Sequence, residues 1–540
     1  MKHRLFILSA LAGAALAFGS CSNYLDETAD KSGNAYIYHM DQLYGLMGQP
    51  SLYLGSTSEE QAMNGAGAFM QEQYLMGDGI RVSPDFYLKG NPSMFTSASY
   101  AYNMYSWEDY SLKNDYQVSG FTWKKAYAQI YTFNTVLENL DNVQQTTRTM
   151  NDQVKGEACF GRAFYHFLLL TQYCRWEEDA PGIGYRDNTS STATLARETV
   201  AYTLGRIYAD LDSAEVCLTR AGRTAFDAAQ TYRPTMPTVQ ALRARIALYR
   251  GDYETALTNA ENALKGYGEL EVIAQNPNYT LMPMIPLNYL DQDSVPIASM
   301  SGFISLPMNV MTLYNQATLA CPEIMLPCLS ANVSTWCIPL SESFYNLFGD
   351  KVNDNRWTLF YSSNYSLGMA NGLGAEIMTG GISWETQQWL EPWDKASYWH
   401  FYSQWGATNV VGMTTAEMYL TQAECLARKG QTAEAAEVLK TLRRTRFTDQ
   451  TAADNIGGSV QEVLDERSRE MGPFWRFYEA KRLNGAENAG IEIRREVLTD
   501  LTDINSVTEI VIPADDPRWA LPFNEVERQL LGWEQNPGWE

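Results

Sequence analysis

Residues of the types that most often catalyse reactions are sparse in this chain of 540 residues, which holds only four histidines, His3, His39, His166 and His400. No H-E-x-x-H, G-x-S-x-G, phosphate-binding loop or G-x-G-x-x-G pattern occurs. His166 lies in a nearly all-apolar segment, which predicts a buried structural role. Adjacent acidic residues among the 63 acids are interpreted as solvated. A glycosidase needs only two carboxylates about 5–10 Å apart, so a glycoside hydrolase stays an alternative to a non-enzymatic protein.

Aromatic residues in segments without helical periodicity offer a different chemistry. Aromatic rings match the flat C–H faces of sugars, while amides and carboxylates satisfy the hydroxyls. Two long stretches, about 50–118 and 266–413, are rich in such residues, and the second holds half of the fourteen tryptophans. Long irregular segments on a rigid scaffold often carry binding sites. The tryptophans between 384 and 399 also have a spacing that fits a small satellite core.

Cys21 offers covalent chemistry. It follows a basic start, with Lys2 and Arg4, and an apolar run over residues 5–18, as in an export signal. That run is shorter than the roughly 20 apolar residues that span a bilayer. Small residues lead directly into Cys21, which is similar to the lipobox of bacterial lipoproteins, where the cysteine is lipidated. An ordinary signal peptide with an incidental cysteine is the alternative. Residues 22–35 are polar and small, as in a tether.

The charge balance narrows the ligand class. The formal charge is −23 and becomes −25 when residues 1–20 are removed, because Lys2 and Arg4 are lost with no acid. Binding to nucleic acid depends on Lys and Arg that neutralise phosphates, so nucleic acid is excluded as a partner. Adsorption to an anionic membrane surface is disfavoured for the same reason. Sugars and peptides remain, and 45% hydrophobic residues predict a large folded core.

The other cysteines are expected to be structural. Four fall in helical patterns, where a free cysteine behaves as a small buried hydrophobe: Cys159, Cys174, Cys217 and Cys425. Cys321, Cys328 and Cys337 lie close together, and one local disulfide among them is an open alternative. No C-x-x-C metal pattern occurs, and we expect no cofactor. The run NDNR at 353–356 offers oxygens of the kind that Ca²⁺ takes, without EF-hand spacing, which leaves a structural calcium ion as an alternative.

Helices are the elements that must position these residues. The segment 121–141 places one set of side chains on a single face at the i, i+3, i+4, i+7 spacing: Trp123, Tyr127, Ile130, Tyr131, Asn134 and Leu137. The segment 156–176 is apolar almost all round, which predicts a buried helix. A third amphipathic helix is expected over 200–218. Helix aromatics such as Trp123, Tyr127 and Trp475 are interpreted as core.

Two segments resemble each other and predict a repeat architecture. Residues 238–264 and 417–443 each read as helix, short glycine turn, helix, with small residues where the two helices would cross. A single such pair cannot bury its apolar face alone, so pairs stack, as in tetratricopeptide repeats. The 179-residue offset between the two segments means that a large insertion interrupts the stack.

Six segments, in order, resemble the SusD/RagB family of outer-membrane lipoproteins of Bacteroidetes. They include the family's Cys-x-x-(Phe/Tyr)-Leu-Asp start, its W-x3-Y-x2-I-x3-N helix, its ERxxEL segment and its QNPGY-like tail. The matching stretches are CSNYLD (21–26), WKKAYAQIYTFN (123–134), EACFGRAFYHFLLLTQY (157–173), AEMYLTQAECLARKG (416–430), DERSREMGPFWRFYEAKRLN (465–484) and LPFNEVERQLLGWEQNPGW (521–539). The chain departs from the family at GPFW (472–475), Glu479 and Ala480, which puts local packing in doubt more than function.

The resemblance implies a mainly α fold, with about four tetratricopeptide-like helix pairs and large loop-rich insertions. We expect one domain over 36–540 after a signal at 1–20 and a lipidated tether at 21–35. Within that domain, the scaffold would cover about 36–265 and 414–485, the ligand-binding part about 50–118 and 266–413, and a C-terminal tail 486–540. Such proteins sit in the outer membrane, lipid-anchored and facing outward, and deliver oligosaccharides, or in some members peptides, to a TonB-dependent SusC-like barrel without catalysis.

The resemblance also places the ligand site. NVSTWCIPLSESFYNLF (332–348) is similar to the family segment in which a loop tryptophan precedes a short helix, so Trp336 is the first candidate. Phe86 and Tyr87 lie where the family has aromatics after an early acidic segment, and Tyr314 is a further candidate. For each of these four residues, the competing interpretation is a side chain that packs against the protein and does not contact ligand. A peptide or glycopeptide binder, the hydrolase, and a lid that contacts only the barrel remain alternative functions.

Overall fold

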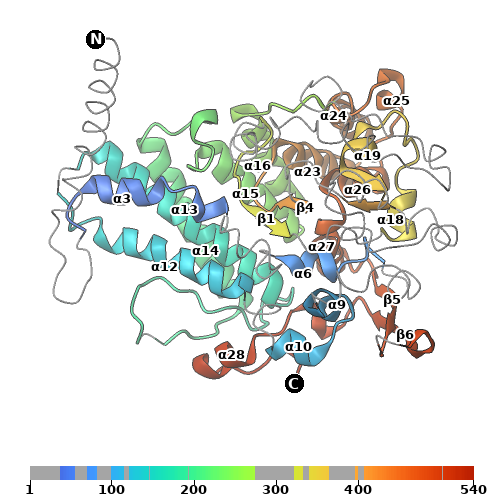
Figure 1. Cartoon of the computed structure of the whole chain (residues 1–540). Coiled ribbons are helices and arrows are strands. Elements are labelled where there is room, and N and C mark those ends of the chain that lie inside the picture. The colour runs from blue at the N-terminus through green and yellow to red at the C-terminus, as the bar shows by residue number, and fades with distance from the viewer. Residues whose placement is uncertain are drawn as a thin grey trace, which may run out of the picture.

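The computed structural model describes eleven stretches of the chain, and the fold is presented for these residues. They are 37–54, 70–81, 99–114, 121–144, 146–192, 194–273, 322–332, 340–363, 396–398, 407–500 and 503–540. The predicted signal and tether lie outside them, as does Cys21. Helices dominate, and they succeed one another across the molecule from α12 and α13 at one side to α24 and α26 at the other (Figure 1). None of the described helices is long and apolar enough to cross a membrane.

Three long helices form the first part of the scaffold. They are α12 (Phe121–Asn139), α13 (Arg148–Tyr173) and α14 (Val200–Arg220), and α3 (Met40–Met47) packs on α13. From residue 156 to 173, every side chain of α13 except Arg162 is buried, as its all-round apolar sequence predicted. At Gly161 an added Cβ would lie 2.3 Å from the ring of Phe133, so glycine lets α12 approach α13 closely.

Two helical hairpins continue the scaffold and confirm the predicted repeat. Their helices are α15 (Met236–Tyr249) with α16 (Tyr253–Gly266), and α23 (Thr415–Arg428) with α24 (Thr432–Arg443). The turns need glycine because Gly251 and Gly430 have φ of 73° and 79°, a left-handed conformation. Helix α16 packs on α23 although the long insertion separates them in sequence. One apolar cluster therefore runs through both hairpins.

The remaining described helices are shorter or lie near the C-terminus. They are α4 (Ser51–Leu54), α6 (Gln71–Leu75), α9 (Ser99–Tyr105), α10 (Asp109–Asn114), α18 (Glu342–Asn346), α19 (Asn355–Phe360), α25 (Gln450–Asp454), α26 (Val460–Met471), α27 (Arg476–Glu487) and α28 (Glu525–Leu531). Four 3₁₀ helices accompany them: η1 (Ala228–Gln230), η7 (Pro473–Trp475), η8 (Ile504–Ser506) and η9 (Pro517–Trp519). Trp475 and Trp123 are buried, as the sequence predicted.

Within the described stretches there are three antiparallel strand pairs, which the sequence did not predict. They are β1 (Leu329–Asn332) with β4 (Ala407–Val410), β2 (Tyr361–Ser363) with β3 (Ala396–Tyr398), and β5 (Ile493–Leu498) with β6 (Val507–Ile512). Four of these strands are only three or four residues long. In the six-residue β5 burial alternates over the first five residues, but the buried Arg495 hides the apolar alternation in the sequence. Residues 333–406 separate β1 from β4, and residues 364–395 separate β2 from β3, so the local sequence contains no hairpin signal for these two pairs.

A buried cluster of charges ties the insertion to the scaffold. It consists of Glu323, Asp354, Arg356, Arg443, Arg446, Glu466, Arg469 and Glu470, and is called the insertion cluster below. Arg356 is fully buried and contacts Asp354 at 2.7 Å, Glu466 at 2.8 Å and Glu470 at 2.9 Å. Both carboxylate oxygens of Asp354, within the stretch considered for calcium, therefore accept hydrogen bonds from a guanidinium.

A second buried cluster of charges joins helices of the scaffold to one another. Arg245 of α15 donates to both carboxylate oxygens of Glu417 of α23, and to the backbone oxygens of Val411 and Gly412. Glu479, at a position where the chain departs from the family pattern, accepts from Arg467 and Arg482. Burial alone would raise the pKa of Glu479, but the two guanidinium groups lower it to about 2. This carboxylate is therefore ionised in the folded protein.

The described cysteines behave as the sequence predicted. Cys159, Cys174, Cys217 and Cys425 are buried free thiols. Cys328 is also a buried free thiol, and burial raises its pKa to about 12. Cys321 and Cys337, the two cysteines considered for a local disulfide with Cys328, lie outside the described residues.

Candidate functional site

The residues predicted to bind ligand all lie outside the described residues, but the chain ends that lead to two of them are described. Trp336 lies in 333–339, Phe86 and Tyr87 lie in 82–98, and Tyr314 lies in 274–321. Ile80 forms an antiparallel bridge with Leu340, and the Ser341 amide donates to the Gly79 oxygen at 3.1 Å. The segment with Phe86 and Tyr87 thus starts where the segment with Trp336 ends. These four residues, 79, 80, 340 and 341, are called the shared stem.

Chain length limits how far the candidate residues can lie from this stem. Trp336 is four residues from Leu340, and Phe86 is six residues from Ile80. A fully extended chain spans at most about 3.6 Å per residue, which puts limits of roughly 14 Å and 22 Å on the two separations. The segments that hold the two predicted aromatics therefore join the described fold at one place, the shared stem.

One side of the shared stem rests on a small apolar core. Leu340, Phe344 and Phe348 pack with Ile273 and the half-buried Trp357. Ser341 caps α18 by accepting a hydrogen bond from the Phe344 amide at 3.3 Å. The short helix expected after the loop tryptophan is therefore present, and it fixes the chain immediately after 333–339.

The other side of the shared stem is held by Arg495 of β5. Its buried guanidinium donates to the backbone oxygens of Leu75 at 3.0 Å, Met76 at 3.2 Å, and Gly77, and to that of Tyr105 at 2.9 Å. Asp78 in the same turn pairs with Arg476 of α27 at 2.7 Å. Burial lowers the pKa of Arg495, and backbone dipoles take the place of a carboxylate partner. The chain is thus held firmly at the point from which 82–98 departs.

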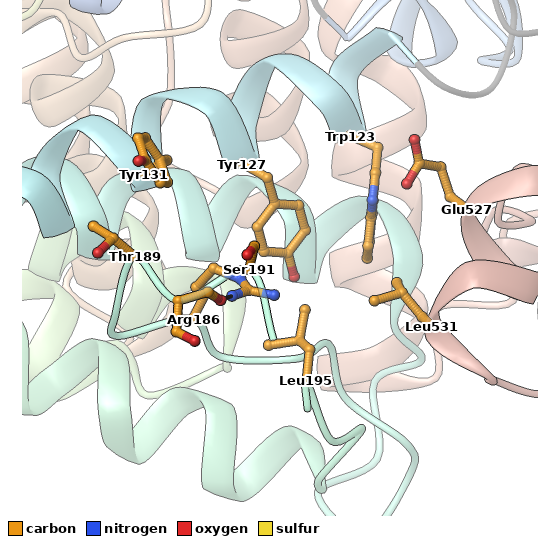
Figure 2. Close-up of a pocket in the computed structure, with 10 residues that line it drawn as sticks. Trp123, Tyr127, Tyr131, Arg186, Thr189, Ser191, Leu195, Glu527 and Leu531 are labelled. Carbon is orange, nitrogen blue, oxygen red and sulfur yellow. Dashed lines mark hydrogen bonds between the residues drawn. The ribbon is translucent and has the colours of Figure 1, made fainter. Parts of the chain in front are cut away.

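A groove lies elsewhere, along the outer face of α12. It has a volume of about 290 Å³. Trp123, Tyr127 and Tyr131 follow one another along it at four-residue spacing, and α28 closes the Trp123 end (Figure 2). The residues that line it are Trp123, Tyr127, Tyr131, Arg186, Thr189, Ser190, Ser191, Leu195, Glu527 and Leu531.

The wall opposite α12 is an extended segment, residues 175–199, called the tethered loop. Its described residues, 175–192 and 194–199, form no helix or strand, yet side chains of α12 hold the segment at several points. The Tyr127 hydroxyl donates to the Gly184 oxygen at 2.7 Å, and the Asn134 amide donates to the Arg186 oxygen at 3.1 Å. Glu138 accepts from the amide of Thr189 at 2.8 Å and from its hydroxyl at 2.5 Å. The groove is therefore walled on both sides by fixed structure.

His166 of α13 holds the same loop from beneath. It is fully buried; its Nδ1 lies 2.8 Å from the Arg162 oxygen, and its Nε2 lies 3.1 Å from the Arg186 amide nitrogen. Because that amide can only donate, Nε2 accepts and Nδ1 carries the proton. The ring stacks on Tyr185 with centroids 4.0 Å apart. The predicted structural role of His166 is confirmed.

We expect His166 to remain neutral far below the usual titration range. Burial lowers its pKa to about 3. A histidine with a depressed pKa favours folding above its unfolded pKa of about 6.5, and that stability is lost as the pH falls from there towards 3. NMR of the imidazole nitrogens should show the neutral Nδ1–H tautomer at pH 5. An imidazolium signal with a midpoint near pH 6 would contradict this assignment.

Sequence reasoning missed this groove because it assigned the aromatic face of α12 to the core. Trp123 is 5% exposed, as expected, but Tyr127 is half-buried and Tyr131 is 52% exposed. The expectation that Tyr131 faces the core is therefore wrong. One signal was available: 175–199 is a Pro-, Gly- and Thr-containing gap between two long helices, and loops longer than roughly 12–15 residues are usually functional or disordered.

Comparison with known families identifies the fold. A family model described as "Starch-binding associating with outer membrane" matches residues 58–248, and one described as "SusD family" matches 383–539. The chain belongs to the SusD/RagB family. The predicted helical-repeat fold of this SusD/RagB chain is thereby confirmed. A comparison with curated proteins returned no match.

Solved structures agree with the fold of this SusD/RagB protein. A SusD superfamily protein from Bacteroides thetaiotaomicron matches with a TM-score of 0.60 and 18% identity, over 92% of this chain and all of that one. A laminarin-binding SusD-like protein matches with a TM-score of 0.55 and 15% identity, over 93% and 100% of the two chains. Surface glycan-binding protein A from B. thetaiotaomicron matches with a TM-score of 0.55 and 14% identity, over 92% and 98%.

Proposed function

We propose that this protein captures glycans at the cell surface and delivers them to a TonB-dependent SusC-like barrel in the outer membrane, without catalysis. The carbohydrate class rests on the family, one of whose models is described as starch-binding, and on two structural relatives, one named as laminarin-binding and one named as a surface glycan-binding protein. Cys21 would carry the lipid anchor. A single acyl chain binds membranes only marginally, so firm anchoring needs at least two.

The ligand site would lie above the shared stem. The observation that supports this proposal is the Ile80–Leu340 bridge, because the segments that hold Trp336 and Phe86 join the described fold there. Tyr87 and Tyr314 would complete an arc of aromatic rings. Sugar rings stack on such surfaces and leave their hydroxyls to polar neighbours. No histidine or acidic pair has to be assigned a chemical step for this function.

Trp336→Ala is expected to weaken glycan binding by at least tenfold, because the principal stacking surface is removed. Titration calorimetry of the mature chain from residue 22, alone and with the barrel, against starch, laminarin, shorter oligosaccharides and peptides would measure it. Tyr110→Ala is the matched control, since Tyr110 is an aromatic on α10 that is 71% exposed. Equal affinities in wild type and Trp336→Ala would refute the site.

Two other outcomes would change the function. Binding to peptides alone would favour a RagB-type peptide or glycopeptide binder. Sugar turnover abolished by one Asp or Glu substitution would favour a glycoside hydrolase. If glycan uptake in cells were unaffected by Trp336→Ala while deletion of the protein abolished it, the protein would act as a lid that contacts only the barrel.

A further inference from the structure

The groove along α12 is built from segments that take no part in the shared stem. Its walls are α12, the tethered loop and α28, whereas the stem joins residues 79–80 to 340–341. We propose that this groove is a second carbohydrate-binding site, which holds part of a neutral glycan chain by stacking sugar rings on Tyr131 and Tyr127. The proposal takes its ligand class from the proposed function but uses a separate site.

The aromatic residues of α12 form a platform of the right shape. Trp123, Tyr127 and Tyr131 follow one another at intervals of four residues, a rise of about 6 Å per step, and all three line the same hollow (Figure 2). Tyr131 is 52% exposed, and among the described residues its side chain has neither a hydrogen bond nor a ring partner. Tyr127 keeps its hydroxyl on Gly184, so only its ring is offered to a ligand. Sugar rings can therefore stack on the exposed ring of Tyr131 and on the neighbouring, fixed ring of Tyr127.

The polar residues of the groove indicate a neutral ligand. Arg186 uses one nitrogen to donate to the Ser190 oxygen at 2.8 Å and has no ion-pair partner among the described residues. By contrast, its neighbours Arg162 and Arg206 pair with Asp210 at 2.6 Å and Asp187 at 2.8 Å. Glu527 stands at the opposite, Trp123 end of the groove (Figure 2). A sugar chain, whose hydroxyls both donate and accept, satisfies both ends, whereas a uniformly charged ligand would be repelled at one.

The groove is organised before any ligand arrives. Seven described hydrogen bonds hold the tethered loop to α12 and α13, at Gly184, Arg186, Asp187, Asn188 and Thr189. A further bond runs from the Trp533 indole to the Leu195 oxygen at 2.9 Å. Binding to fixed walls avoids the entropy cost of immobilising side chains when the ligand binds. A shallow site can therefore contribute measurable affinity.

The size of the groove determines how it would act. At about 290 Å³ it lies at the lower end of ordinary ligand pockets, so it can hold one or two sugar rings. Affinity for an isolated short ligand would be low. A chain long enough to reach the principal site as well would gain from the high effective concentration of its second segment. We therefore expect the groove to favour long chains over short ones.

The test compares Tyr131→Ala with Tyr202→Ala, a tyrosine of similar exposure, 48%, on α14. Both side chains are on the surface, so both variants should melt like wild type. Calorimetry would use laminarin, soluble starch and the heptasaccharides of both. For the polysaccharide that binds wild type, the affinity of Tyr131→Ala should be about five- to tenfold lower. The affinity of Tyr131→Ala for the heptasaccharide should equal that of wild type. The affinity of Tyr202→Ala should equal that of wild type for both ligands.

Combining Tyr131→Ala with Trp336→Ala separates this proposal from the proposed function. Trp336→Ala should retain weak polysaccharide binding, which Tyr131→Ala should then remove. Binding lost in Trp336→Ala and unchanged in Tyr131→Ala would overturn the second site alone. Binding lost in Tyr131→Ala and unchanged in Trp336→Ala would overturn the principal site alone. Wild type that binds neither polysaccharide, alone or with the barrel, would overturn both, and equal weakening by Tyr202→Ala would overturn the second site.

Discussion

Arg356→Ala is expected to lower the free energy of unfolding by about 3–5 kcal/mol, because breaking a buried ion pair leaves its partner charged in the interior. Here three carboxylates, those of Asp354, Glu466 and Glu470, would lose a guanidinium that touches each of them within 3 Å. Chemical denaturation followed by circular dichroism would measure the change.

The matched control is Arg444→Ala, a few residues from Arg446 of the same cluster. Arg444 pairs with Asp454 at 2.7 Å, but their side chains are 46% and 42% exposed. Exposed pairs contribute about 0–1 kcal/mol. A similar loss in both variants would show that burial of Arg356 does not matter.

The pH dependence gives a further check on Arg356→Ala. Without the guanidinium, the pKa values of the remaining buried carboxylates should rise, so protonation would relieve the repulsion. The stability that the protonated carboxylates contribute is then present at low pH, and it is lost as the pH rises through their raised pKa values. Burial already raises the pKa of Glu323 in this cluster to about 7. The deficit relative to wild type should therefore be smaller at pH 5 than at pH 8.

Gly412→Ala is expected to cost about 3 kcal/mol, the upper part of the range for overpacking. A Cβ at Gly412 would lie 1.8 Å from the backbone oxygen of Leu326, which no side-chain rotation can relieve. The amides of Val411 and Gly412 both donate to the Cys328 oxygen, and the Gly412 oxygen accepts from Arg245. A shift here would disturb the place where residues 326–328 of the insertion meet its C-terminal end and Arg245 of the scaffold.

Gly349→Ala is the matched control, because no atom lies within 4 Å of a Cβ at that position. Thermal unfolding and glycan calorimetry on both variants would test the prediction. We expect Gly412→Ala to melt earlier and to bind glycan more weakly, since the insertion carries Trp336. A stable Gly412→Ala with wild-type affinity would contradict the tight approach to Leu326.

The helical scaffold could be predicted because its signals are local. The glycine turns at Gly251 and Gly430, the small residues at the helix crossings and the all-apolar α13 each lie within one element, and the structure contains them. The burial of His166 also followed from its immediate neighbours. Such features need no knowledge of distant segments.

The charged interior could not be predicted from the sequence. In a chain with 63 acids, Glu323, Glu466 and Glu479 look like any solvated carboxylate. Glu323 and Glu466 are paired with arginines from distant segments, Arg446 and Arg356, which lie 123 and 110 residues away in the sequence. The partners of Glu479 are close in sequence, but nothing in the local pattern shows that the helix face they share is buried. The exposed Tyr131 was missed for a related reason, since only the path of the tethered loop decides which rings of α12 are covered.

The contact between α16 and α23 has an evolutionary consequence. The Tyr419 hydroxyl donates to the Gly268 oxygen at 3.0 Å, and the Thr415 hydroxyl donates to the Glu269 oxygen at 2.6 Å, so the chain leaves the scaffold and rejoins it at neighbouring points. The intervening sequence can therefore diverge, lengthen or be exchanged between homologues without moving a scaffold helix. Three of its residues, Glu323, Asp354 and Arg356, are not free to drift, because the scaffold's own buried charges depend on them. New ligand preferences could thus evolve by replacement of the whole insertion, provided that these three charged residues are retained.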